Sequence, residues 1–215
     1  MVLANAIYFK AIWENEFDAS KTHEEPFHLL NGGTVSVPMM GMKTGENLAY
    51  AAGEGWQAVA LPYKGGLTDM VVIVPDLVNF ETFESTLTAE RYNGILAAMQ
   101  PQEVILSMPK FTFEARIGLK EFLSGMGLQA AFDLNAADFS GIDARRGLFI
   151  GDAIHNAFIS VDEKSTEAAA ATFIMMMQSR VPQGIVLTID RPFFFFIRDV
   201  PTGTILFMGR VLEPQ

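Results

Sequence analysis

The side chains that most often perform catalysis are few in this sequence, and their spacing matches no catalytic pattern. The three histidines are His23, His28 and His155, and none lies in an HExxH arrangement. There is no GxSxG turn and no phosphate-binding loop, and Gly125-Met126-Gly127 indicates a helix stop. Adjacent acids such as Glu24-Glu25 are typical of a solvated face. We therefore expect no enzymatic activity.

The composition narrows the possible partners. The chain has 215 residues, half of them hydrophobic, and a net charge of -10, which predicts one folded unit with a substantial core. Binding to nucleic acid or to anionic membranes requires clustered Lys and Arg, which this acidic sequence lacks. Neither is therefore expected as a partner. The chain contains no cysteine, which excludes disulfides and cysteine-ligated metals. We expect no cofactor and no metal.

One connection in the chain is unusually long. It runs from Asp162 to Pro182, between the strand-like runs 157–161 and 185–189, and compact domains seldom contain a connection of this length without a functional reason. A short helix capped by Ser165 or Thr166 is one interpretation, but it leaves the apolar second half unexplained.

A strand is the other interpretation of this connection. With period two, the even positions 166–172 carry only small uncharged side chains, whereas Glu167 falls on the other face. Residues 166–179 include no Pro or Gly, so every residue there is able to pair on both sides. The segment is therefore compatible with a loop in one state and a strand in another.

Short motifs follow one another from end to end of the chain. They are N-A-I-Y-F-K (5–10), V-P-M-M (37–40), L-P-Y-K-G (61–65), M-P-K-F (108–111), A-D-F-S-G-I (137–142), E-K-S-T-E-A-A-A-A-T (163–172), I-D-R-P-F-F-F-F-I (189–197) and G-T-I-L-F-M-G-R-V-L-E-P (203–214). Each motif alone is weak evidence. In this order they resemble the serpin family of protease inhibitors, whose loop insertion is a known case of strand addition.

The resemblance implies an α+β fold with several mostly antiparallel sheets and a few helices. It implies that the strand Val2–Lys10 lies in the large sheet, with Asn5 hydrogen-bonded across a gap to His155 and holding the sheet closed. Trp13 is expected at the mouth of that gap, and Lys110 of the M-P-K-F motif also controls its opening. A buried Asn satisfied by backbone and a Trp packed in an ordinary core are the simpler alternatives.

The resemblance also implies a mechanism, namely suicide inhibition of a serine protease through a covalent acyl complex and loop insertion. The hinge that must insert comprises Glu163, Ser165, Thr166, Glu167, Ala168, Ala169, Ala170, Ala171 and Thr172. Ser165 stands where inhibitory members usually have Gly, and it lacks glycine's backbone freedom. We therefore expect a changed insertion rate.

Two peptide bonds are candidates for cleavage by the protease. The family spacing counted from Glu163 favours Ser179-Arg180, whereas Arg180-Val181 suits the acidic pocket of a trypsin-like enzyme. The alternative functions are a non-inhibitory serpin-like binding protein and an inactive fragment. The resemblance further implies an extracellular protein that is monomeric when complete, although no signal peptide is visible at Met1.

The remaining elements are predicted from local signals. Hairpins are expected within 27–74, where Asn31-Gly32-Gly33 and the stretch 64–67 mark turns, and helices within 80–99. We also expect a long strand at 104–113 that bends at Pro109, a helix at 117–125, a strand at 148–161, the reactive loop at 162–184 and strands within 185–214. The helical N-terminal part of the family domain has no counterpart, so the chain is expected to be one domain lacking that part.

Overall fold

The computed structural model describes residues 1–42, 45–144, 146–164 and 184–214. The chain forms two compact units. The first unit comprises Met1–Phe9 and Thr112–Ile159, and the second comprises Lys10–Phe111 and Ser160–Gln215.

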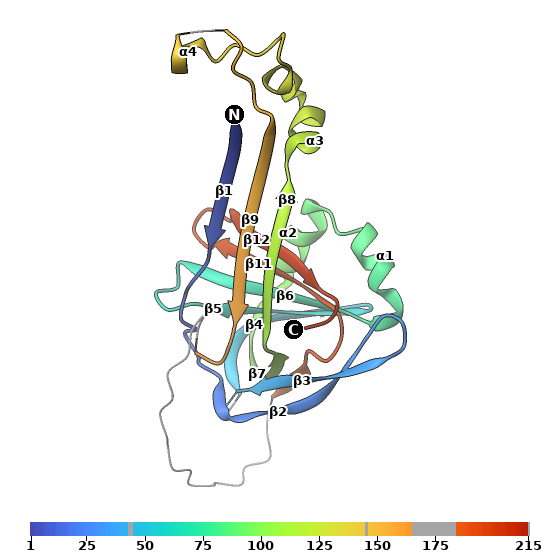
Figure 1. The fold of residues 1–215 in the computed structure, drawn as a ribbon. Helices are drawn as coiled ribbons and strands as arrows, with labels where there is room; N and C mark the ends of the chain where they lie inside the picture. Colours follow the sequence, from blue (N-terminus) through green and yellow to red (C-terminus); the bar gives the residue numbers. More distant parts are fainter. Residues whose placement is uncertain (43–44, 145, 165–183, 215) are drawn as a thin grey trace. The chain divides into compact units, whose positions relative to one another are not determined.

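The first unit is built on a three-stranded sheet with the order β1-β9-β8 (Figure 1). Its strands are β1 (Val2–Tyr8), β9 (Asp152–Val161) and β8 (Phe111–Gly118). The central β9 pairs with β1 in parallel, in a register that runs from Val2 opposite Asp152 to Tyr8 opposite Phe158. The rings of Tyr8 and Phe158 stack with centroids 5.7 Å apart. Among the described strands β1 lies at the edge of this sheet, and it carries exposed apolar side chains, including Val2 at 63% and Tyr8 at 57%.

Short helical segments complete the first unit. They are α3 (Lys120–Leu123), a π-helical turn (Ser124–Leu128), a 3-10 turn (Gln129–Phe132) and α4 (Ser140–Asp143). A small core of Phe132, Ile150 and Ala153 holds them together. The helix expected at 117–125 starts later because residues 117–118 belong to β8. Gly127 has a φ of 102°, a left-handed conformation that suits glycine and interrupts the helix.

The second unit contains a nine-stranded sheet with the path β12-β11-β6-β5-β4-β7-β3-β2, and β10 also pairs with β7. The strands are β2 (Asp18–His28), β3 (Thr34–Gly41), β4 (Glu46–Gly53), β5 (Trp56–Pro62), β6 (Thr68–Pro75), β7 (Gln100–Pro109), β10 (Ile185–Thr188), β11 (Phe193–Asp199) and β12 (Ile205–Val211). The strand pairs along this path are antiparallel, and among the described strands of this sheet only β10 and β7 pair in parallel. Mostly antiparallel sheets with few helices confirm the predicted α+β class.

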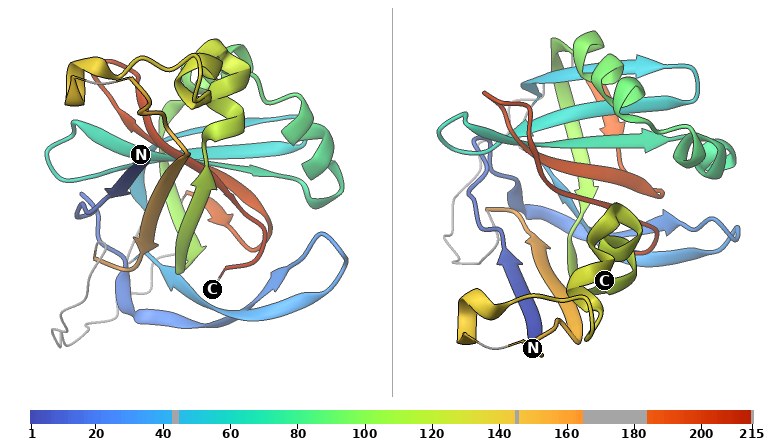
Figure 2. Two further views of the ribbon diagram at one scale, coloured as in Figure 1. Left: turned by 45° about the horizontal axis from the view of Figure 1, so that its top comes forward. Right: turned by 90° about the horizontal axis from the view of Figure 1, so that it is seen from above.

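Two helices, α1 (Phe80–Ser85) and α2 (Ala89–Ala98), lie against one face of this sheet (Figure 2). A 3-10 turn (Leu77–Asn79) leads into α1. The ring of Phe80 stacks on that of Phe194 at 4.8 Å and 6°, and Tyr92 packs on Phe196 at 4.5 Å. The hydroxyl of Thr88 accepts a hydrogen bond from the Arg91 amide at 3.2 Å and so caps α2. Aromatic contacts therefore fix both helices on β11.

The local turn chemistry explains two hairpins. Gly32 (φ 84°) lies in the turn between β2 and β3, and Gly65 (φ 93°) and Gly66 (φ 67°) lie between β5 and β6. The strand expected at 104–113 is instead two strands, because β7 ends at Pro109 and β8 begins at Phe111 in the other sheet. A proline cannot donate to the ladder, which favours this break. The strand expected at 148–161 begins only at Asp152.

Neither a membrane-spanning helix nor a metal-binding cluster is found among the described residues. None of their helices is long and apolar enough to cross a membrane. Within the same ranges, no group of three or more His, Cys, Asp or Glu side chains is arranged to hold a metal ion.

A buried ion pair joins β6 to β11. The carboxylate of Asp69 accepts hydrogen bonds from Nε and one terminal nitrogen of Arg198, both at 2.8 Å, and both side chains are largely buried. A bidentate contact of this kind stabilises the pairing of the two strands and also restricts its geometry. Because Asp69 pairs directly opposite Arg198 in the ladder, the ion pair reinforces the β6–β11 register.

We expect Asp69→Asn to destabilise the second unit by about 3 kcal/mol, because it leaves a buried guanidinium without its counter-charge. Urea denaturation followed by circular dichroism measures the loss. The matched control is Asp76→Asn, since Asp76 is half exposed and lies 3.7 Å from Arg191; its effect should stay below about 0.5 kcal/mol. Equal losses for the two variants would contradict a structural role for the buried pair.

Candidate functional site

Strand β9 leads directly into the segment predicted to be the reactive loop. Residues Asp162, Glu163 and Lys164 are described, whereas 165–183 lie outside the described residues. The hinge positions from Ser165 to Thr172 and the two candidate bonds at Ser179, Arg180 and Val181 therefore remain predictions. The structure describes the three residues at the proximal end of this segment and their contacts with other described residues.

Glu163 is held by two side chains and a backbone amide. Its Oε1 lies 2.6 Å from Lys110 Nζ and accepts a hydrogen bond from the Thr22 hydroxyl at 2.7 Å. Its carbonyl oxygen accepts a hydrogen bond from the Phe17 amide at 2.8 Å. The Glu163 side chain is 12% exposed. We call Glu163, Lys110 and Thr22 the Glu163 latch.

The electrostatics of this latch favour the charged carboxylate. Burial by itself raises the pKa of Glu163, but the hydrogen bonds from Lys110 and Thr22 and the charge of Lys110 outweigh it, so the pKa lies below the ordinary glutamate value. A carboxylate with a lowered pKa contributes stability above its unfolded pKa and loses it as the pH falls through the folded one. The latch should therefore open in acid.

Trp13 forms an aromatic clamp on the neighbouring backbone. It is 2% exposed, stacks on Tyr63 with centroids 4.5 Å apart and meets Phe17 edge-on at 6.2 Å. Its Nε1 donates to the Asp162 carbonyl at 2.9 Å, and its backbone amide donates to the Lys164 carbonyl at 3.2 Å. Burial, followed by the negative charge of Asp69, raises the pKa of Tyr63, so this phenol stays neutral. Trp13 thus holds the residues on both sides of Glu163.

Asn5 and His155 lie in the first unit, directly opposite each other in the β1–β9 ladder. The family resemblance implied that they meet across a gap, and the structure shows the two strands paired at this point. Figure 1 shows β1 and β9 side by side and pointing in the same direction. Side-chain bonding between Asn5 and His155 remains a prediction. The register nevertheless places both residues on the pair of strands that must separate if a new strand is to enter between them.

Sequence reasoning did not identify Thr22, Phe17 or Tyr63 as parts of the anchor. Thr22 lies in a polar stretch, S-K-T-H-E-E at 20–25, which indicates only a surface strand. Its partner Glu163 is 141 residues away, so local spacing holds no signal for the contact. Tyr63 belongs to the L-P-Y-K-G motif and could have been found there.

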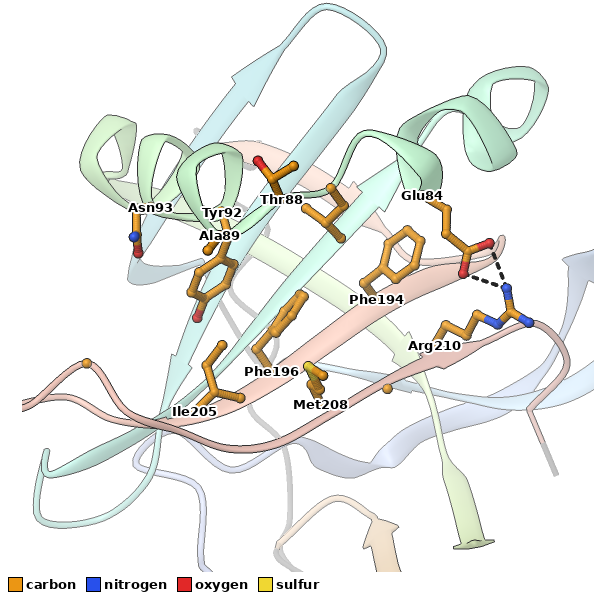
Figure 3. A pocket seen from close by; sticks show the side chains of 13 residues that line it. Glu84, Thr88, Ala89, Tyr92, Asn93, Phe194, Phe196, Ile205, Met208 and Arg210 are labelled. Carbon is orange, nitrogen blue, oxygen red and sulfur yellow. Dashed lines mark hydrogen bonds and ion pairs between the residues drawn. The ribbon is translucent and has the colours of Figure 1, made fainter. Parts of the chain in front are cut away.

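A separate pocket of about 720 Å³ lies among α2, β11 and β12 (Figure 3). Phe194, Phe196 and Met208 form part of its apolar lining. Tyr92 is 5% exposed, and within the described residues its hydroxyl has no hydrogen-bond partner. The ion pair between Glu84 Oε2 and Arg210 NH1, 2.6 Å long, lies at one end of the pocket.

Comparison with known proteins identifies the fold family. The family model described as serpin (serine protease inhibitor) matches residues 1–214. The chain belongs to the serpin family. The short motifs in the sequence thus belong to one family pattern that extends over residues 1–214.

Individual relatives are similar to this serpin chain over nearly all of its length. An uncharacterized serpin-like protein of Thermococcus kodakarensis is 44% identical over 220 residues, which cover 100% of this chain and 50% of the relative. Iris of Ixodes ricinus is 40% identical, covering 99% and 57%, and leukocyte elastase inhibitor A of Rattus norvegicus is 36% identical, covering 100% and 58%.

A solved structure of thyroxine-binding globulin in complex with thyroxine is also similar to this chain. It superposes with a TM-score of 0.85 at 32% identity, covering 99% of this chain and 56% of that one. The chain thus spans about half the length of the relatives that it matches.

We expect Glu163→Gln to weaken the latch by about 1–2 kcal/mol at neutral pH, because it replaces charged hydrogen bonds by neutral ones. Thermal melts at pH 7 and pH 4 measure the effect. The difference in melting midpoint between the parent and the variant should become smaller in acid, because Glu163 of the parent begins to take up a proton there. Glu24→Gln, on an exposed strand face, is the control. An equal difference in melting midpoint at the two pH values would contradict a role for the charge of Glu163.

Trp13→Phe should cost about 1 kcal/mol, since it removes the hydrogen bond to Asp162 but keeps an aromatic ring on Tyr63. Trp13→Ala should cost about 3–5 kcal/mol through the cavity that it leaves. Urea unfolding measures both. The second tryptophan, Trp56, allows a further check, because Trp56→Phe leaves Trp13 as the sole indole reporter of this anchor. Equal costs for the two Trp13 variants would exclude a packing role.

Proposed function

We propose that the protein containing this chain is a suicide-substrate inhibitor of serine proteases, and that its cleaved loop enters the sheet between β1 and β9. The observation that carries the proposal is the parallel pairing of these two strands. A segment that follows β9 and turns back would run antiparallel to both of them. Short hairpins join antiparallel strands readily, whereas parallel pairing is slightly less stable per residue.

The exchange of strands supplies the driving force. Opening the sheet breaks one parallel ladder of seven residue pairs, and the inserted strand replaces it with two antiparallel ladders. At about 1 kcal/mol for each net hydrogen bond, the gain is on the order of 5–10 kcal/mol. The small side chains at Thr166, Ala168, Ala170 and Thr172 allow this segment to enter without burying a charge.

The chemistry requires only the peptide bond of the loop and the groups of the protease. The protease serine attacks the carbonyl carbon of the reactive bond, the amine leaves with a proton, and an acyl-enzyme ester remains. We assign this bond to Ser179-Arg180, with Arg180-Val181 as the alternative. Insertion that precedes hydrolysis of the ester carries the bound protease away from its working geometry and traps the covalent complex.

The role of the Glu163 latch in this proposal is to hold the proximal hinge before cleavage. Glu163, Lys110 and Trp13 keep residues 162–164 attached to the second unit, and Asn5 and His155 hold β1 against β9. Because the relatives are about twice as long, inhibition by these 215 residues alone is itself part of the proposal. The family resemblance also supports an extracellular, monomeric protein.

The test is incubation of the 215-residue chain with elastase-like and trypsin-like serine proteases. We expect a covalent complex that survives denaturing electrophoresis. We also expect a released peptide that begins at Arg180; a peptide that begins at Val181 would move the reactive bond by one residue. The control is Ala170→Pro, because proline lacks the N–H that an inserted strand needs. This variant should be cleaved at the same bond but form no complex. Cleavage of both proteins without any complex would contradict inhibition.

A non-inhibitory binding protein is the second candidate, and the pocket at Tyr92 favours it. The similar thyroxine-binding globulin structure is a complex with a small ligand, which makes such a role a reasonable alternative. Thermal melts before and after cleavage of the loop separate the two candidates. An inserting loop raises the midpoint markedly, whereas a passive loop leaves it unchanged.

A further inference from the structure

The distal end of the loop joins the second unit at β7, next to a residue that is paired on both sides. Val104 of β7 pairs on one side with Glu46 of β4 and on the other with Ile185 of β10. The residue before each of these flanking strands is a glycine, namely Gly45 before β4 and Gly184 before β10. Both glycines face the residue that precedes Val104, which is Glu103.

A β-carbon on either glycine would come unusually close to Glu103. A Cβ at Gly184 would lie 2.9 Å from the Glu103 carbonyl oxygen and 3.3 Å from its Cγ. A Cβ at Gly45 would lie 2.6 Å from Glu103 Cγ and 2.8 Å from its Oε1. At Gly45 the obstacle is the side chain of Glu103, which would have to move. At Gly184 the obstacle is backbone, which cannot rotate away as a side chain can.

Immediately after Gly184 the chain becomes firmly attached. Leu187 and Ile189 are fully buried, and the Ile189 amide donates to the Ser107 carbonyl at 2.8 Å. The carbonyl of Asp190 accepts a hydrogen bond from the His28 amide at 2.7 Å. Gly184 is therefore the point at which the distal end of the loop joins the sheet.

We propose that Glu103, Gly45 and Gly184 form a seat that fixes the distal end of the reactive loop, and that these three are positioning residues for protease binding. The proposal rests on the proposed inhibitory function. A loop fixed at its distal end presents the reactive bond in fewer conformations, so less ordering is required when a protease binds. The seat should control how fast the protease associates. The proximal hinge should instead control how often an encounter ends in a trapped complex.

The experiment compares Gly184→Ala with the parent protein in two measurements. Hydrogen–deuterium exchange at the amides of Ile185–Thr188 should become about tenfold faster, because β10 loses its close approach to β7. The rate of association with a serine protease should fall about tenfold, with the stoichiometry of inhibition unchanged. Gly118→Ala is the matched control, since its added Cβ would meet no atom within 4 Å.

A second set of variants separates the backbone of Glu103 from its side chain. Glu103→Ala removes the Cγ that a Cβ at Gly45 would meet but keeps the carbonyl oxygen that a Cβ at Gly184 would meet. We expect Gly45→Ala to displace the Glu103 side chain and so to speed exchange at 185–188. Glu103→Ala should restore normal exchange in Gly45→Ala and should not restore it in Gly184→Ala. Restoration in both would overturn the role assigned to the backbone at Gly184.

The remaining outcomes are equally decisive. Unchanged exchange at 185–188 in Gly184→Ala would overturn the seat. Faster exchange with an altered stoichiometry and a normal association rate would overturn the positioning role. If the parent protein traps no protease, the proposed function fails, whereas the exchange data still decide whether the seat exists.

Discussion

The proposed loop insertion depends on the parallel pairing of β1 with β9. This ladder is the contact that must be stable before cleavage and replaceable afterwards. Before cleavage, the hydrogen bonds between β1 and β9 hold the sheet closed. After cleavage, a strand that enters between them pairs antiparallel with both, and antiparallel pairing is slightly more stable per residue than the parallel pairing that it replaces. The exposed apolar side chains of β1, such as Val2 and Tyr8, show that this strand contributes little buried surface of its own to the described sheet.

The two ends of the loop are held by different physical means. At the proximal end, charge and aromatic stacking dominate, through Glu163 with Lys110 and Trp13 with Tyr63. The ion pair of Glu163 with Lys110 should weaken in acid, because the carboxylate takes up a proton as the pH falls. At the distal end, close backbone packing at Gly184 and the buried Leu187 and Ile189 dominate. This difference between the two ends suits the proposed insertion, in which the loop moves from its proximal side.

Local signals in the sequence predicted much of the fold. Asn31-Gly32-Gly33 lies in the turn between β2 and β3, where the Asn31 side chain accepts a hydrogen bond from the Gly33 amide at 2.8 Å. The helix at Phe80–Ser85 and the Thr88 cap follow from helical spacing and capping chemistry. These features depend on neighbouring residues and are therefore visible in the sequence.

Features set by distant contacts were not predictable in the same way. The strand expected at 104–113 divides at Lys110 because its two halves pair in different sheets, and nothing in the local pattern indicates those partners. The partners Thr22 and Phe17 of Glu163 come from a polar stretch far away in the chain. The family resemblance supplied Asn5, His155, Trp13 and Lys110 as candidates, whereas the contacts of Trp13 and Lys110 became apparent only in the structure.

A removable bond between β1 and β9 gives the most direct test of the account. Ala6 and Asn156 are opposite each other in the ladder, and the chain has no cysteine of its own, so Ala6→Cys with Asn156→Cys provides a single disulfide across the pair. We expect the reduced protein to trap a serine protease and the oxidised protein to be cleaved without trapping it. Trapping by the oxidised protein would show that the loop does not enter between these strands, and would contradict the account.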